Sequence, residues 1–110
     1  MKHLALTALL GLASTAALAA GPAEPAKAPT CFACHGQGGL STNGMYPILA
    51  GQHTNYIEQA LHEYKSGERK NPIMGAQAAG LSEADIRELA LYFNAQPGPL
   101  HTPTEQGALK

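Results

Sequence analysis

The clearest pattern in the chain is the recurrence of apolar residues every three or four positions, the spacing of one face of an α-helix. It appears first over about residues 54–66, where Thr54 is suited to cap the start and Gly67 to end the helix. Pro72 limits any continuation. The apolar face of this expected helix is formed by Tyr56, Ile57, Ala60, Leu61 and Tyr64.

A second helix is expected over about residues 82–95. Ser82 and Asp85 form the pattern of a capping box, with Asp in the place of Glu. Its apolar face consists of Ile86, Leu89, Ala90 and Phe93. A short third helical segment fits residues 30–35, and no run alternates apolar and polar positions as a strand does. The pattern therefore predicts an all-α fold of about three helices with essentially no strand.

The N-terminus follows a different pattern. Lys2 and His3 precede an apolar run from Leu4 to Ala20, and small residues occupy the end of that run. This is the layout of a secretory signal peptide, which we expect over residues 1–20, with cleavage after Ala19 or Ala20. A membrane anchor is the alternative, but the run is shorter than the about 20 residues of a typical span. We therefore expect export to the periplasm and no stable membrane insertion after cleavage.

Proline-rich stretches bound the rest of the chain. Residues 21–29 contain three prolines and are expected to form a flexible leader, and residues 97–110 contain three more and are expected to form a loose tail. Residues 30–96 remain as one small domain, a size that commonly depends on a metal, a disulfide or another staple. The formal net charge of −1 indicates neither nucleic acid nor an anionic membrane as partner.

The strongest chemical signal is the sequence Cys31-Phe32-Ala33-Cys34-His35. Two thiols at this spacing, followed directly by a histidine, match the attachment signature of a covalent c-type haem. On a helical turn the three side chains share one face. Cys31 and Cys34 can therefore each form a thioether to a haem vinyl group, while His35 points at the iron as proximal ligand.

Three other interpretations of the cysteine pair compete with haem attachment. A zinc site needs about four ligands, but the chain has only two cysteines and no suitably spaced histidine pair. A thioredoxin-like pair would follow a strand, and no strand pattern precedes Cys31. A structural disulfide between Cys31 and Cys34 remains open in an oxidising compartment, but it gives no reason for His35.

The second iron ligand is expected to be Met74. This residue lies in Asn71-Pro-Ile-Met-Gly75, between the two long helices, where small residues would let a loop lie flat on the macrocycle. Met45 is the other sulfur candidate, but it follows His35 so closely that the chain would have to change sides almost at once. The rival histidines are His53, His62 and His101, of which His53 is the most serious.

Glycines are concentrated between Gly36 and Gly44. The strand, helix and lysine that accompany a phosphate-binding loop are absent from this segment. We expect these glycines to let the backbone pass close to a flat ligand.

The chain resembles the class I c-type cytochromes of the small bacterial single-haem kind, because it contains several of their sequence motifs in the same order. The resemblance extends from Cys31 to about Gln96 and rests on Cys-Phe-Ala-Cys-His-Gly36, Tyr46-Pro-Ile-Leu-Ala-Gly-Gln52, Asn71-Pro-Ile-Met74, Leu81-Ser-Glu-Ala-Asp-Ile86 and Leu89-Ala-Leu-Tyr-Phe93. It implies a small cytochrome c fold wrapped around one covalent haem c. It also implies that the Pro47 carbonyl accepts a hydrogen bond from the His35 ring, which orients the imidazole.

The function implied is electron transfer in the periplasm, with a His/Met-ligated iron that cycles between Fe(II) and Fe(III). Redox proteins are the expected partners, and no enzymatic activity is expected because no catalytic triad or carboxylate pair is recognisable. One alternative is a haem-bearing electron-transfer subunit of a larger oxidoreductase. Another is a haem enzyme or gas sensor with an open sixth position.

Two further expectations concern surfaces. The prolines at 22, 25 and 29 interrupt the N-terminal helix usual in this family, so its crossing with the C-terminal helix should be reduced, which leaves room for a partner subunit. No charged residue occurs between Lys27 and Glu58 or between Lys70 and Glu83. The exposed haem edge should therefore be ringed by small and apolar residues such as Phe32, Ala33, Ala76 and Ala79.

Overall fold

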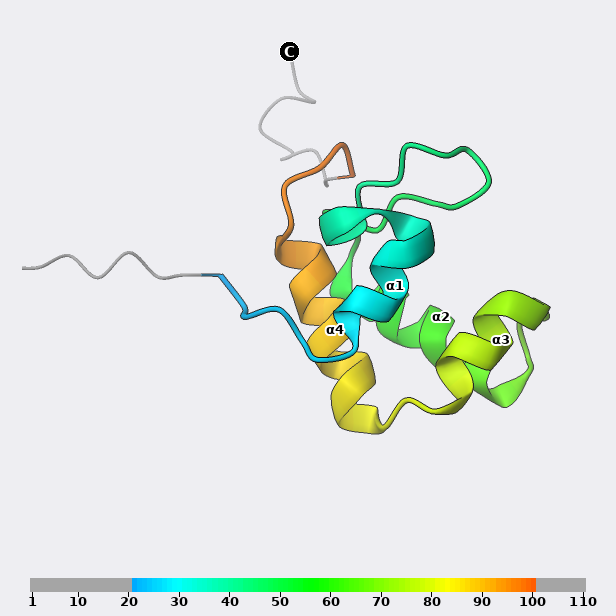
Figure 1. The fold of residues 1–110 in the computed structure, drawn as a ribbon. Helices are drawn as coiled ribbons and strands as arrows, with labels where there is room; N and C mark the ends of the chain where they lie inside the picture. Colours follow the sequence, from blue (N-terminus) through cyan, green and yellow to red (C-terminus); the bar gives the residue numbers. More distant parts are fainter. Residues whose placement is uncertain (1–20, 101–110) are drawn as a thin grey trace, which may run out of the picture.

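The computed structural model describes residues 21–100. The expected signal peptide, most of the expected tail and His101 lie outside this range. The described residues form four α-helices and one 3-10 turn, in the order α1 (Ala28–His35), η1 (Gln37–Gly39), α2 (Thr54–Ser66), α3 (Pro72–Ala79) and α4 (Glu83–Ala95). They contain no strand, so the predicted all-α class is confirmed (Figure 1).

Helix α3 was not among the three predicted helices. Its N-cap is Asn71, whose side chain accepts hydrogen bonds from the backbone nitrogens of Ile73 and Met74. Pro72 occupies the first helical position, where its fixed φ suits the helix and its missing N–H costs nothing. The expectation of a flat loop around Met74 was therefore wrong. Asn-Pro is a helix-start signal, although in the sequence Pro72 was considered only as a barrier to the preceding helix.

The ends of the two long helices agree closely with expectation. At the start of α4, the Asp85 backbone nitrogen donates to Ser82 Oγ at 3.1 Å, and the Ser82 nitrogen donates to Asp85 Oδ2 at 2.8 Å, which completes the predicted capping box. Gly67 ends α2 in the left-handed conformation with φ of 82°. Thr54 was wrongly expected as a cap: it is the first helical residue, and the N-cap is His53, whose side chain makes no capping bond.

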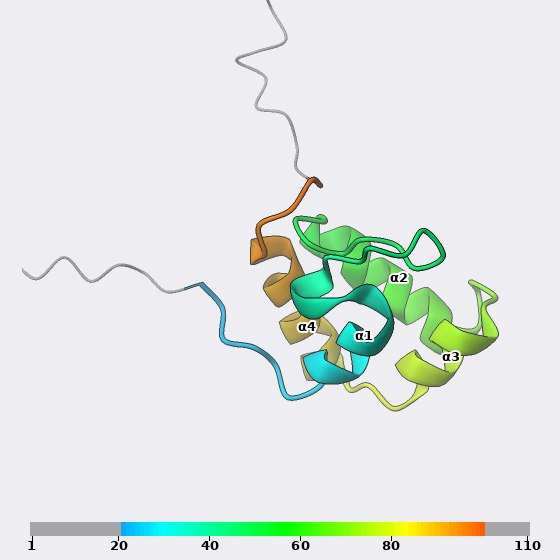
Figure 2. The same ribbon diagram turned by 45° about the horizontal axis from the view of Figure 1, so that its top comes forward.

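Most of the hydrophobic core is supplied by α4. Its buried side chains are those of the predicted apolar face, together with Tyr92: Ile86, Leu89, Ala90, Tyr92 and Phe93. Ala28 from α1 and Ile57 from α2 join the same cluster. Figures 1 and 2 show α1, α2 and α4 meeting at the centre of the molecule, with α3 against α2 at its margin.

The short helix α1 packs on α4 through Phe32. The Phe32 ring centroid lies 6.2 Å from that of Tyr92 and 6.3 Å from that of Phe93, the latter in an edge-on arrangement. The expectation that Phe32 belongs to the haem rim was therefore wrong, because this ring supports the crossing of α1 and α4. Ahead of α1, Pro25 is buried, and the Tyr92 hydroxyl donates to Glu24 Oε2 at 3.4 Å.

Among residues 21–100, no helix is long and apolar enough to cross a membrane.

Candidate haem-binding site

A cavity of about 550 Å³ lies between the helices. Cys31, Cys34 and His35 line it from α1, and Met74 lines it from α3. The remaining walls are mostly apolar. They include all five residues of the predicted apolar face of α2, namely Tyr56, Ile57, Ala60, Leu61 and Tyr64, and the α4 residues Leu89 and Phe93. The apolar face of α2 therefore serves the cavity more than the core, which explains why Tyr56 is 49% exposed.

His35 is held in one orientation by the loop that follows η1. The ring is 6% exposed, and its Nδ1 lies 2.7 Å from the Pro47 carbonyl oxygen. A carbonyl can only accept, so Nδ1 carries the proton and donates it, which leaves Nε2 with a free lone pair. The Tyr46 ring packs at 6.4 Å from the imidazole. The structure thus contains the His35–Pro47 contact that the resemblance implied.

The Pro47 loop is fastened to the end of α4. The Gly51 nitrogen donates to the Phe93 carbonyl at 2.8 Å, and the Asn94 side chain donates to the Gln52 carbonyl at 2.9 Å. The Phe93 carbonyl belongs to the last turn of α4 and also accepts from the nitrogen of the C-cap residue Gln96 at 3.2 Å. The last turn of α4 therefore anchors the loop that carries the acceptor for His35.

The glycine-rich segment has a different role from the one expected. Gly39 is buried with φ of 81°, and a β-carbon there would lie 2.8 Å from Phe93 Cδ1 and 2.9 Å from Leu49 Cβ. None of the glycines from Gly36 to Gly44 lines the cavity. Gly39 therefore lets the backbone pass close to α4 and to the Pro47 loop, and the expectation that these glycines approach a flat ligand was wrong.

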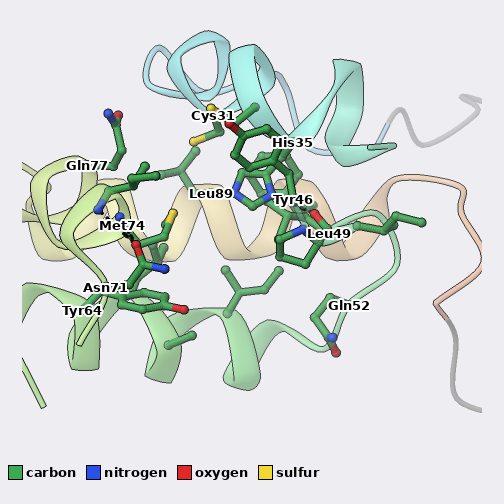
Figure 3. Close-up of a pocket in the computed structure, with 18 of the residues that line it drawn as sticks. Cys31, His35, Tyr46, Leu49, Gln52, Tyr64, Asn71, Met74, Gln77 and Leu89 are labelled. Atoms are coloured by element: carbon green, nitrogen blue, oxygen red, sulfur yellow. Dashed lines mark hydrogen bonds between the residues drawn. The ribbon is translucent and has the colours of Figure 1, made fainter. Parts of the chain in front are cut away.

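The candidates for the second iron ligand differ in burial and in whether they line the cavity. Met74 is half-buried in the cavity wall, and Figure 3 shows its sulfur and the His35 ring projecting into the same space from α3 and α1. Met45 also borders the cavity but is 77% exposed. His53 and His62 are exposed and do not line the cavity. His62 instead lies 3.4 Å from Glu83 on the outer surface.

Both cysteines are half-buried in the wall contributed by α1, and neither forms a disulfide. Burial raises the pKa of the Cys31 thiol. Within residues 21–100, no three His, Cys, Asp or Glu side chains are grouped as a metal site requires. These facts disfavour the zinc and disulfide interpretations and leave both sulfurs available to a ligand in the cavity.

Polar residues that were not expected from the sequence also line the cavity, among them Arg69 and Asn71. Arg69 lies over the rings of Tyr56 and Tyr64, 5.8 and 5.3 Å from their centroids, and its Nε is 3.1 Å from Glu63 Oε2. Hydrogen bonds to the two tyrosines raise the pKa of Arg69, which therefore stays charged. The Asn-Pro pair was a signal for Asn71, whereas no local spacing pointed to Arg69, which follows the end of α2.

The site fits a covalent haem. Its volume lies within the about 300–1,000 Å³ of typical ligand pockets, and its walls are largely apolar. Two free thiols stand on one wall at the spacing of the attachment signature. An imidazole nitrogen and a thioether, the two ligand types of electron-carrying haems, reach into the same space from different helices.

Comparison with known proteins agrees with this chemistry. Residues 23–96 match the cytochrome c family. The chain is 40% identical to cytochrome c-554(548) of Halomonas halodenitrificans over 64% of its own length and 88% of that protein. It is 35% identical to the thiosulfate dehydrogenase electron acceptor of Thiomonas intermedia, over 93% of this chain but only 50% of the relative. The chain thus spans about half the length of some relatives and most of another.

Among solved structures, the chain is similar to part of the thiosulfate dehydrogenase of Marichromatium purpuratum. The TM-score is 0.59 at 35% identity, over 73% of this chain and 18% of the other. The family match covers every element from α1 to α4, and the attachment signature stands where α1 meets the cavity. The chain therefore belongs to the cytochrome c family and carries one haem c, bound covalently through Cys31 and Cys34.

Proposed function

We propose that this protein transfers electrons through a haem iron held axially by His35 and Met74. The haem supplies a one-electron change between Fe(II) and Fe(III). The observation that carries the proposal is that an imidazole and a thioether enter one apolar cavity from α1 and α3. If His35 and Met74 both ligate the iron, they would leave no position for peroxide or oxygen, so we propose a carrier and not a catalyst.

The surrounding residues support this role. Pro47 holds the proton on His35 Nδ1, which directs Nε2 to the iron side and increases its basicity. The walls from α2 and α4 are mostly apolar. A low-polarity surrounding together with a thioether ligand favours Fe(II) and raises the reduction potential.

The proposal includes export. The pattern over residues 1–20 is that of a cleaved signal peptide, which would deliver residues 30–96 as a haem domain to the periplasm, with residues 21–29 as leader and 97–110 as tail. Small redox proteins of that compartment are the proposed donors and acceptors.

A second candidate is an electron-transfer subunit of a larger oxidoreductase. It is favoured by two relatives whose names connect them with thiosulfate dehydrogenase, one as its electron acceptor and one as the enzyme itself. Affinity purification of the tagged protein at native expression separates the two: a carrier elutes alone, and a subunit brings a stoichiometric partner.

Carbon monoxide binding tests the electron-transfer proposal. Carbon monoxide needs an open position on reduced iron, so the spectrum of the reduced wild-type protein should not change when the gas is added. A reductive titration should follow a single one-electron curve. Stoichiometric binding of carbon monoxide at neutral pH would contradict axial ligation by two residues and favour a haem enzyme or gas sensor.

A further inference from the structure

Asn71 controls the start of the helix that carries Met74. Its Oδ1 accepts from the backbone nitrogens of Ile73 and Met74 at 3.0 Å each, and its carbonyl accepts from the nitrogen of Gly75 at 2.8 Å. Pro72 has no N–H. Every backbone N–H group in the first turn of α3 is therefore bound to this one residue.

Apart from this cap, α3 is held by its packing against α2. It has eight residues, and Ala78 is its only buried one. A helix this short is marginal on its own, because isolated helices need about 12–15 residues to form in water. By contrast, α4 has five buried side chains. Because α3 is short and has one buried residue, we expect its first turn to depend on the Asn71 cap.

Asn71 is also part of the cavity wall. It lines the same cavity as Met74, and Figure 3 shows its amide beside the Met74 thioether. Opening of the first turn of α3 would carry Met74 away from the cavity while the α4 core stays folded, as local opening does in weakly anchored segments.

We propose that Asn71 is the positioning residue for Met74: through its cap on α3 it sets the fraction of molecules in which the sulfur is on the iron. This inference rests on the proposed ligation by Met74. It predicts that the cap, independently of overall stability, controls how readily an external ligand reaches the iron.

Imidazole binding to the oxidised holo-protein measures that fraction. The apparent dissociation constant falls in proportion as the binding-competent, open fraction rises. Loss of an N-cap side chain shifts a helix equilibrium by about fivefold. Asn71→Ala should therefore lower the apparent dissociation constant for imidazole about fivefold. Residue 71 is already extended before a proline, with φ of −152° and ψ of 115°, so alanine fits its backbone.

Two further variants isolate the cap. Asn71→Ser keeps an oxygen that can accept from the same nitrogens and should restore imidazole binding to within about twofold of wild type. Ser82→Ala removes the cap of α4, so it should lower the thermal midpoint without changing imidazole affinity. Hydrogen exchange at the Ile73 and Met74 amides measures the cap directly. In Asn71→Ala this exchange should accelerate about fivefold. In Asn71→Ser it should be slower than in Asn71→Ala, and this comparison does not depend on imidazole.

The outcomes separate this inference from the proposed function. Unchanged imidazole affinity in Asn71→Ala, or an equal change in Ser82→Ala, overturns the role of Asn71 and leaves ligation by Met74 intact. If Met74→Ala retains the iron–sulfur charge-transfer band, both the ligation and the role of Asn71 are overturned.

Discussion

Single residues decide the chemistry of the cavity, and each depends on a second residue that fixes its position: His35 on a residue twelve positions later and Met74 on one three positions earlier. His35 is oriented by Pro47, and Pro47 belongs to a loop that Phe93 and Asn94 fasten to α4. Met74 is carried by a helix that begins at Asn71. The site is therefore built from pairs in which one residue supplies the ligand atom and another fixes where it points.

Met74→Ala should remove the weak iron–sulfur charge-transfer band of the oxidised protein and lower the reduction potential, because a thioether ligand favours Fe(II). Absorption spectroscopy and a redox titration measure both effects. Met45→Ala is the matched control, since Met45 borders the same cavity but is 77% exposed. If Met45→Ala removes the band and Met74→Ala does not, the choice of methionine is wrong.

At the scale of elements, the helices differ in how they are held. Helix α4 is held by the core and by its capping box, whereas α2 uses its apolar face mainly for the cavity. Helix α1 is short, but Phe32 joins it to Tyr92 and Phe93. Ion pairs link α2 and α4 at the surface, such as Arg87 to Glu58 at 3.2 Å, and exposed pairs of this kind contribute little.

The capping box of α4 predicts a dependence of stability on pH. Hydrogen bonds from the Ser82 backbone and side chain lower the pKa of Asp85 below its usual 3.8. A carboxyl whose pKa is lower in the folded state stabilises the fold above its unfolded pKa, and this contribution is lost as pH falls through the folded pKa. The thermal midpoint of Asp85→Asn should therefore fall less than that of wild type when pH is lowered through and below 3.8.

Glu88→Gln is the control for this measurement, because it removes a carboxylate from the exposed side of the same helix. It should follow the wild-type pH dependence. Equal pH dependence in wild type and Asp85→Asn would show that the capping box is not the group responsible.

At the scale of the whole molecule, the mouth of the cavity is nearly free of charge. Ala33, Met45 and Ile73 line the cavity and are exposed, the last two at 77% and 55%. Arg69 is the one charged residue among those lining the cavity in the described part of the chain, and Glu63 is paired with it. The exposed residues that line the cavity are thus uncharged, as expected from the sequence, but they include the polar Thr30, Asn71 and Gln77. Of the four residues expected at the rim, Ala33 lines the cavity, whereas Phe32, Ala76 and Ala79 do not.

Electron self-exchange between oxidised and reduced copies tests this rim without an external partner. If two copies meet at their uncharged rims, the rate measured by NMR line broadening should change little between low salt and about 0.15 M, where the Debye length is about 8 Å. Met45→Lys should make the rate rise with salt, because two like charges would then meet. A steep rise in wild type would indicate contact through a charged face.

The sequence alone determined features that depend on local spacing. The helical class, the extents of α2 and α4, the capping box at Ser82 and the haem attachment through Cys31 and Cys34 follow from residues close together in the chain. Helical periodicity and caps are properties of neighbouring residues, so they are readable without the fold. Asn71 and Pro72 also form a local start signal for α3. Pro72 alone, however, equally fits a residue that prevents α2 from continuing, so the sequence did not distinguish the two roles.

Only the tertiary structure decided which side chains meet. The Phe32 ring packs against α4 instead of lining the rim. Gly39 lies so close to the Phe93 ring that no side chain would fit between them. Arg69 joins the cavity between Tyr56 and Tyr64. These contacts depend on how helices cross and how loops return to them. Local spacing does not encode that arrangement, because packing between distant segments sets it.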